Sequence, residues 1–296
     1  MAEFIRHDMP EDFDLVLCGD HHVGALAFRE AAWLKVVEWI ANRRVKIPRF
    51  WGHQGDIVEG KLIDSPHFNP ESLRPKQTNI KQQADYWLDI NKPIFPYLLW
   101  QTQGNHDRYL KRNFDVMEYV MKDRLDMYEV LGGPQTWVQL RPGLNLHSFH
   151  GRRSLPKGAK DPLQRPGNQK AWLKCELEQL AGDCVIMCMG HTHACIIVEP
   201  IEQYTLLSDP DEGGDVQGHF FVEPNAMLGE SLYVPKESRW YVNTGTFRAS
   251  GFFGAKHDKR GASDYAEEAG YRPMPTSYAL AKVRGGQVVS IEKIIV

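Results

Sequence analysis

Short polar motifs follow apolar, strand-like runs of this chain in a regular order, and this alternation restricts the fold to the α/β class. Three apolar runs, 13–18, 97–102 and 184–189, each end just before a motif rich in Asp, Asn and His. A weaker run, 144–149, is closed by His150, and a short one containing Pro48 precedes Asp56. Open α/β sheets place their active sites at the carboxyl ends of strands. We therefore expect the polar motifs to meet at one edge of a sheet.

The spacing of the motifs supports the same architecture. The five motifs are Gly19-Asp20-His21-His22, Gly55-Asp56-Ile57-Val58-Glu59, Gly104-Asn105-His106-Asp107, His150-Gly151 and Gly190-His191-Thr192-His193. Between 36 and 49 residues separate Asp20, Asp56, Asn105, His150 and His191 from one another in turn. A strand, a crossover helix and the next parallel strand need about 30 residues or more. Each interval thus has room for roughly one such unit.

The residue types in these motifs are those that bind divalent cations. In an extended chain, side chains two positions apart point to the same side, so Asp20 and His22 are expected to face one cation, and His191 and His193 likewise. Asp56 is a lone carboxylate whose two oxygens suit a bridge between two cations. Nitrogen and oxygen donors without thiolates favour two ions of Mn, Fe, Zn, Co or Ni over a structural zinc site. Among these, Mn²⁺ is the expected cation.

This ordered set resembles the calcineurin-like metallophosphoesterase superfamily, whose pattern is DxH, GDxx(D/E), GNH(D/E), a lone His and GHxH. All five blocks are present between Asp20 and His193, and a looser likeness covers 239–247. The resemblance implies one metal held by Asp20, His22, Asp56 and His193, and a second held by Asp56, Asn105, His150 and His191. The chain departs from the pattern at Glu59-Gly60, since many relatives carry an Arg after the acidic residue. A phosphate-binding role at this corner is therefore not implied.

The other histidines need separate interpretations. His147 competes with His150 for one ligand position, because both lie near the same strand. We prefer His150, which stands at the strand end before Gly151. His21, between two expected ligands, should point away from the metals. The remaining histidines are expected to be ordinary surface or core residues: His7, His53, His67, His219 and His257.

Helical periodicity predicts helices at 28–43, 77–90, 116–130 and 169–180, and a hairpin joins strands 136–140 and 144–149. Short strands follow His193. Helix-rich alternation followed by antiparallel strands fits the α/β fold of the resembled superfamily, a four-layer α-β-β-α sandwich of two packed mixed sheets flanked by helices. We expect one domain over residues 1–296, with rim insertions at 57–83, 151–168 and 248–275.

Composition favours a cytoplasmic enzyme without a membrane partner. The 296 residues carry a net charge of −3, and the apolar runs are far shorter than the ~20 residues of a membrane span. The first twelve residues lack the basic-then-apolar layout of a signal peptide. The five cysteines are an odd number, and three of them lie in apolar runs where reduced cysteine acts as a small hydrophobe. The oligomeric state stays open.

The resemblance implies a dinuclear metal centre with a bridging hydroxide that attacks phosphorus. His106, next to Asn105, is the expected general acid. Asp107 either orients His106 through a hydrogen bond or caps the following turn. Arg152 and Arg153, directly after His150, and Arg248, in the loop after the 239–247 strand, are expected to bind substrate.

The substrate class is inferred from the two loops that contain these arginines, residues 152–165 and 247–260. The first loop carries five basic side chains, and the second mixes basic side chains with phenylalanines. This composition suits phosphate contacts and base stacking, although solvated loops have the same composition. The favoured function is a metal-dependent phosphodiesterase or nuclease acting on nucleic acid or nucleotides. The alternatives are a phosphomonoesterase acting on proteins or small molecules, and a non-catalytic scaffold of the same fold.

Overall fold

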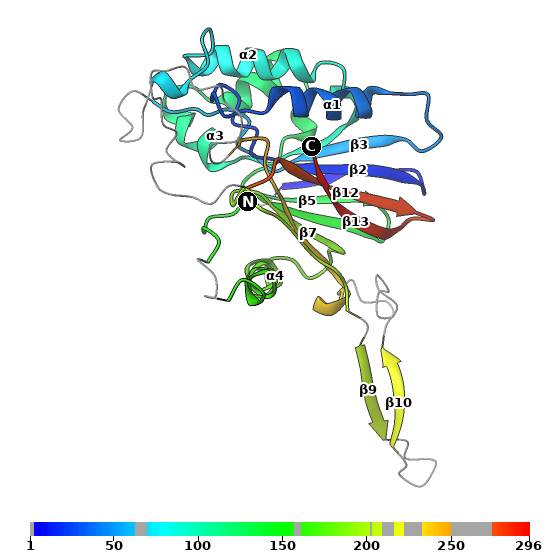
Figure 1. Ribbon diagram of the computed structural model, residues 1–296. Coiled ribbons are helices and arrows are strands. Elements are labelled where there is room, and N and C mark those ends of the chain that lie inside the picture. Colours follow the sequence, from blue (N-terminus) through cyan, green and yellow to red (C-terminus); the bar gives the residue numbers. More distant parts are fainter. Residues whose placement is uncertain are drawn as a thin grey trace.

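Two mixed β-sheets packed face to face form the centre of the molecule (Figure 1). The computed structural model describes residues 3–62, 70–156, 161–201, 203–208, 216–221, 233–249 and 274–296. The five-stranded sheet has the order β13 (Gln287–Ile295), β12 (Ser277–Arg284), β2 (Phe13–Cys18), β3 (Arg49–His53), β4 (Leu98–Gln101). Its strands β2, β3 and β4 are parallel, whereas β12 runs antiparallel to both of its neighbours.

The six-stranded sheet has the order β1 (Glu3–Arg6), β5 (Gln135–Arg141), β6 (Leu144–Phe149), β7 (Ile186–Met189), β11 (Trp240–Thr244), β8 (Cys195–Val198). Strands β6, β7 and β11 are parallel, while β5–β6 is the predicted antiparallel hairpin. A separate antiparallel pair, β9 (Gln203–Ser208) and β10 (Val216–Phe221), lies apart from both sheets in Figure 1.

Helices cover the outer face of each sheet, so the predicted four-layer α-β-β-α sandwich is confirmed. Helices α1 (Glu30–Ala41) and α2 (Ile80–Asn91) pack on the five-stranded sheet, and α4 (Gln164–Leu177) packs on the six-stranded sheet. Helix α3 (Asn105–Tyr109) is a short helix after β4. The remaining helical segments are Pro70–Ser72, Phe95–Tyr97, Leu110–Arg112, Glu118–Arg124, Tyr128–Val130 and Lys236–Ser238.

The alternation of side chains along β2 shows how one strand serves two layers. Phe13, Leu15 and Leu17 enter the core between the sheets, whereas Val16 and Cys18 face the core beneath α1 and α2. Successive strand residues point to opposite faces, and both faces of β2 are covered. A nearly continuous apolar run is the pattern of such a strand.

Two predicted helices differ clearly from the structure in their bounds or type. Helix α4 begins at Gln164 rather than 169, because Pro166 in its first turn needs no hydrogen-bond partner for the missing N–H. The single helix predicted over 116–130 is wrong. A π-helical segment over Glu118–Arg124 ends before Asp126, which has a left-handed backbone (φ 53°), and a short 3₁₀ turn follows.

Ile57 and Val58, at the start of the first predicted rim insertion, are fully buried in the core beneath α1 and α2. Residues 63–69, 157–160 and 250–273 of the three predicted insertions lie outside the described residues. Within the described ranges, no helix combines the length and apolar character that a membrane crossing requires.

Candidate metal centre

The predicted ligands lie in loops at the carboxyl ends of parallel strands from both sheets. Asp20 and Asp56 follow the neighbouring parallel strands β2 and β3, and His150 and His191 follow the neighbouring parallel strands β6 and β7. Backbone hydrogen bonds join the first two loops, with the Asp20 N–H donating to Gly55 O at 2.9 Å and the His22 N–H to Asp56 O at 3.1 Å. The sandwich therefore brings loops that are distant in sequence to one edge.

The ligand loops have an unusual backbone. Five predicted ligands have positive φ: Asp20 (51°), His22 (50°), Asp56 (56°), His191 (72°) and His193 (61°). Only two other non-glycine residues in the described ranges share this conformation, Lys76 and Asp126. Such residues cost of order 1–3 kcal/mol each and concentrate at functional sites. The expectation of an extended chain at these residues was thus wrong. The pairing of His191 with His193 was wrong as well, because His193 Nε2 lies beside His22 whereas His191 Nδ1 lies beside Asn105.

One group of donor atoms forms around Asp20. The Nε2 atoms of His22 and His193 are 3.2 Å apart. Asp20 Oδ1 lies 3.9 Å from His22 Nε2 and 3.7 Å from His193 Nε2. Asp56 Oδ2 lies 3.7 Å from His22 Nε2. These four side chains are the set that the family resemblance implied for one metal, and we name them the Asp20 cluster.

A second group forms around Asn105. Its Oδ1 atom lies 2.9 Å from His150 Nε2 and 2.9 Å from His191 Nδ1. His150 Nε2 also lies 3.2 Å from Asp56 Oδ2. These are the four side chains implied for the other metal, and we name them the Asn105 cluster.

Asp56 belongs to both clusters, but through one oxygen. Its Oδ2 faces His22 on one side and His150 on the other. Its Oδ1 accepts a hydrogen bond from the His106 backbone N–H at 2.8 Å. Of the two Asp56 oxygens, Oδ2 is therefore the one that faces both clusters, in keeping with a carboxylate that lies between two cation sites.

Both clusters fit divalent cations. A cation bound at about 2.0–2.2 Å to N and O donors holds neighbouring donor atoms roughly 3–3.5 Å apart, close to the spacings observed. Asp20 Oδ1 is fully buried and has no hydrogen-bond partner among the described atoms, although buried carboxylate oxygens are costly without one. Burial opposes a charge on His150, yet Asp56 and Asp20 raise its pKa to about 10. The region therefore favours added positive charge.

Surrounding groups fix the orientation of the ligand histidines. Gln54 O accepts a hydrogen bond from His150 Nδ1 at 2.7 Å, which leaves Nε2 directed at the Asn105 cluster. Glu59 Oε2 lies 3.2 Å from His22 Nδ1, an ion-pair distance, on the side of the ring away from the Asp20 cluster. Such outer partners set the tautomer and the basicity of a metal-binding histidine. Gln54 was not singled out by the sequence, because an amide outside any motif gives no signal.

His147, the competitor of His150, lies elsewhere. It is fully buried against Trp137, with ring centroids 4.5 Å apart, and burial lowers its pKa to about 4. The side chain that reaches the cluster is that of His150, at the end of β6 as the sequence indicated.

Comparisons with known proteins add little to this geometry. No protein-family model and no curated protein matches the chain. Among solved structures, the crystal structure of a metallophosphoesterase from Sphaerobacter thermophilus matches over 95% of this chain and 88% of that one, with 15% identity and a TM-score of 0.36. A match at that TM-score supports no conclusion about this chain. The resemblance therefore rests on the five motifs, the four-layer sandwich and the two clusters.

In fold and in site, the chain resembles a metallophosphoesterase.

Within this metallophosphoesterase-like site, His106 lies beside the Asp20 cluster. Its ring meets that of His22 edge to face, with centroids 4.7 Å apart, and the side chain is partly exposed. Its Nδ1 lies 2.6 Å from the Glu59 carbonyl oxygen, which can only accept. Nδ1 therefore keeps its proton, and Nε2 is the atom that can transfer one.

Asp107 does not orient His106. Its Oδ2 accepts hydrogen bonds from the N–H groups of Gly104 (2.9 Å) and Asp56 (2.8 Å), and its Oδ1 accepts one from Ile57 (3.2 Å). The capping alternative is thus correct in part. Asp107 caps α3 and also ties it to the loop that carries Asp56.

We expect Asp107→Ala to destabilise the protein by about 2–4 kcal/mol, because it leaves three buried N–H groups without their acceptor. Urea unfolding of the chelator-treated protein measures this loss without any contribution from bound metal. Asp8→Ala, at an exposed carboxylate, is the matched control. Equal midpoints for the two variants would contradict this role of Asp107.

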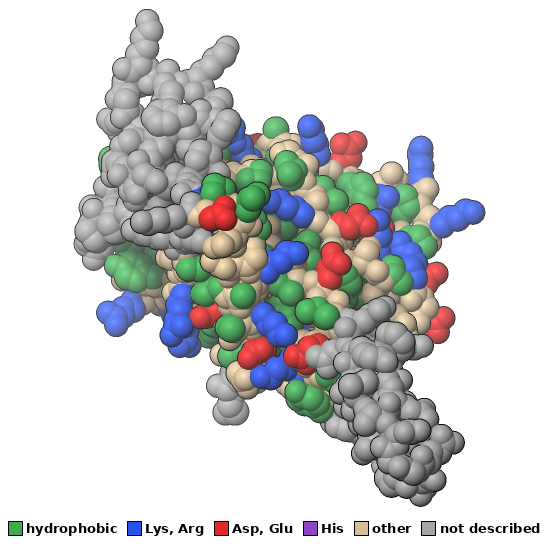
Figure 2. Space-filling model, turned by 60° about the horizontal axis from the view of Figure 1, so that its bottom comes forward, with side chains coloured by type: hydrophobic (Ala, Val, Ile, Leu, Met, Phe, Trp, Pro, Cys, Tyr) green, Lys and Arg blue, Asp and Glu red, His purple; other side chains and the backbone are tan. Residues whose placement is uncertain are grey.

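The three predicted substrate-binding arginines have different environments. Arg152 and Arg153 are exposed, and Arg153 forms an ion pair of 3.0 Å with Glu176 on α4. Figure 2 shows acidic and basic side chains interspersed over the described part of one side of the molecule. Arg248, in contrast, is only 9% exposed and lies 3.4 Å from Glu59. Of the three, Arg248 is the one in contact with the residues around the clusters.

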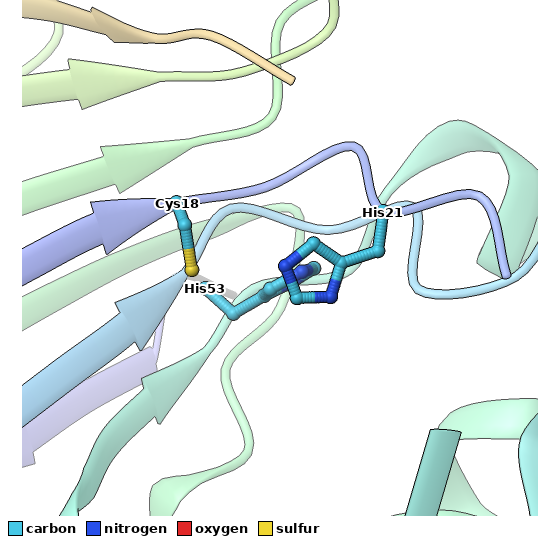
Figure 3. A group of neighbouring side chains, drawn as sticks. All are labelled: Cys18, His21 and His53. Carbon is cyan, nitrogen blue, oxygen red and sulfur yellow. The ribbon is translucent and has the colours of Figure 1, made fainter. Parts of the chain in front are cut away.

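A further group of metal-type side chains, Cys18, His21 and His53, lies deep in the core beside the site (Figure 3). Trp87 Nε1 donates to His21 Nδ1 at 3.1 Å, and the Gly55 N–H donates to His53 Nδ1 at 3.1 Å. Each ring therefore carries its proton on Nε2, which cannot bind a metal in that form. Burial lowers the pKa of both histidines, that of His53 to about 3. We interpret these neutral rings as core packing beneath the ligand loops.

Proposed function

We propose that this chain is a metal-dependent phosphodiesterase that hydrolyses nucleic acid or nucleotides. The proposal of a hydrolase rests on the position of Asp56 Oδ2 between two clusters of N and O donors. When bound, a pair of divalent cations supplies a hydroxide nucleophile at neutral pH and neutralises charge on the phosphoryl oxygens.

The residues of the chain then have distinct tasks. Asp20, His22 and His193 would hold one cation, Asn105, His150 and His191 the other, and Asp56 both. With both ring nitrogens protonated, His106 would transfer its Nε2 proton to the leaving oxygen, since its Nδ1 proton is engaged by the Glu59 carbonyl. The partial exposure of His106 gives a substrate access to this atom.

The surface that follows His106 supports a polyanionic substrate. Arg108 and Arg112 are exposed on α3 and the next 3₁₀ turn, and Tyr109 between them is 57% exposed. Cations with an interleaved aromatic suit a strand whose phosphates and bases extend beyond the scissile bond. Phosphomonoester hydrolysis uses the same ligands, and the buried Arg248 beside the Asp20 cluster would suit a terminal phosphate.

A substrate panel tests the proposal. We expect the Mn²⁺-loaded protein to cleave single-stranded DNA, double-stranded DNA, RNA or bis-p-nitrophenyl phosphate faster than p-nitrophenyl phosphate. Removal of metal by a chelator should abolish every activity, and Mn²⁺ should restore it, because the hydroxide nucleophile depends on the cations. Monoester hydrolysis far above that of every diester would favour the phosphomonoesterase instead.

A further inference from the structure

An exposed aromatic side chain, Tyr109, ends the same short helix that carries a metal ligand and the expected general acid. Helix α3 begins at Asn105 of the Asn105 cluster and continues with His106, whose ring meets that of His22. Tyr109 is the last residue of this helix, and more than half of it is exposed to solvent. The metal-binding motif ends before Tyr109, so the family resemblance gave this ring no role.

The periodicity of the helix places Tyr109 on the same face as both site residues. Residues three and four apart are neighbours on a helix surface, and Tyr109 follows His106 by three positions and Asn105 by four. The opposite face is marked by Asp107 and Leu110, which are both buried. The Cα–Cβ bonds of a helix tilt toward its N-terminus. The Tyr109 side chain therefore leans toward the turn that holds Asn105 and His106.

This position corresponds to one side of the proposed reaction. His106 Nε2 gives its proton to the leaving oxygen, so the leaving group lies on the His106 side of the phosphorus. Tyr109 lies close to one turn farther along α3 than His106, a rise of about 5 Å. A nucleoside attached to the leaving oxygen would extend past His106 toward the Tyr109 ring.

We propose that Tyr109 stacks on the nucleobase of the leaving group and thereby selects esters whose leaving group is a nucleoside. An exposed aromatic ring accepts any base, because every base has a π-face. The small aliphatic alcohol of a phosphoserine or a sugar phosphate offers no such face. This proposal rests on the proposed function and names the leaving group of its substrate.

Three Mn²⁺-dependent cleavage reactions test the inference: a thymidine dinucleotide and its two versions that lack the base on the 3′ or the 5′ side. The nucleoside released without phosphate identifies the leaving side. We expect Tyr109→Ala to lower kcat/KM for the intact dinucleotide about 10- to 100-fold, mainly through KM, because one stacked base is lost. Loss of the base from the released nucleoside should cost the unaltered protein as much and cost Tyr109→Ala nothing more.

The controls separate stacking from a structural effect. Tyr109→Phe keeps the ring and should keep the activity. Tyr128→Ala removes a similarly exposed tyrosine from the turn Tyr128–Val130, outside α3 and both clusters, and should cleave all three substrates as the unaltered protein does. The Mn²⁺ stoichiometry should be the same in every variant, since none of these residues is a ligand.

Binding of the intact dinucleotide to Mn²⁺-loaded His106→Ala, with and without Tyr109→Ala, is measured by calorimetry while turnover is slow. The inference is wrong if Tyr109→Ala binds and cleaves the dinucleotide within twofold of its parent, if only the base of the other nucleoside matters, or if Tyr109→Phe is as poor as Tyr109→Ala. Cleavage that ignores Tyr109 would leave the proposed function standing. Binding that depends on Tyr109 in a protein that cleaves no ester would overturn the proposed function alone, and a protein that neither binds nor cleaves the dinucleotide would overturn both.

Discussion

Replacing Asp56 by alanine is expected to remove both cations and to lower kcat by at least about 1,000-fold. Asp56 Oδ2 faces both clusters, and Oδ1 is engaged by the His106 backbone N–H. Without this carboxylate, each cluster keeps three donors and loses its anionic link to the other. Cations supply several kcal/mol of transition-state stabilisation in such centres, and each 1.36 kcal/mol changes the rate tenfold.

Elemental analysis and Mn²⁺ calorimetry of Asp56→Ala measure the metal content directly. The substitution also places an alanine at a left-handed backbone position, which is less favourable for Ala than for Asp, so the control must make the same change at another left-handed position. Asp126→Ala is that control, because Asp126 has φ 53° and belongs to neither cluster. We expect two cations and full activity in the Asp126 variant. Two cations and unaltered turnover in Asp56→Ala would disprove the bridge.

His106→Ala is expected to lower kcat about 100- to 10,000-fold while both cations remain bound, which is the usual contribution of a general acid. His106 holds its Nδ1 proton on the Glu59 carbonyl and has a partly exposed ring next to the Asp20 cluster. It is not one of the side chains assigned to either cluster. Loss of the His106 side chain should therefore lower turnover without lowering the metal content.

The leaving group provides the sharpest test of this assignment. A p-nitrophenolate leaves without a proton, whereas the alkoxide of a nucleotide ester needs one. The loss of activity in His106→Ala should accordingly be large for a dinucleotide and small for bis-p-nitrophenyl phosphate. An equal loss for both substrates, or the loss of both cations, would rule out the general acid. His150→Ala, which removes a ligand of the Asn105 cluster, is the contrasting variant and should lose metal.

The strands and most helices were predictable because their signals are local. Apolar runs fixed β2 and β7, helical periodicity fixed α1 and α2, and Asn79 with Gln82 forms the capping box that begins α2. Strand β1 escaped prediction because its four residues are too few to show a period and pair with β5, far along the chain. The π-helical turn over Glu118–Arg124 escaped because its apolar spacing resembles that of an α-helix.

The predicted ligand residues could be identified in advance because the residue types and the order of the five motifs can be read directly from the sequence. The contacts that each of these residues makes could not be read from the sequence. That Asp56 uses one oxygen for both clusters, and that Asp107 accepts three N–H groups, depends on how loops from different strands meet. Backbone N–H groups have no identity in a sequence, so no motif could have indicated these contacts.

The amino-acid sequence determined which metal-type donors lie at the strand ends, because apolar runs followed by Asp, Asn and His place those donors there. The tertiary structure decided which donors share a cluster, which oxygen faces both clusters, and that Glu59 contacts both Lys61 and Arg248, which are 187 positions apart in the chain. The physical reason is one of range. Strand and helix preferences act between neighbouring residues, whereas contacts of 3–4 Å between side chains require two packed sheets to bring distant loops to one edge.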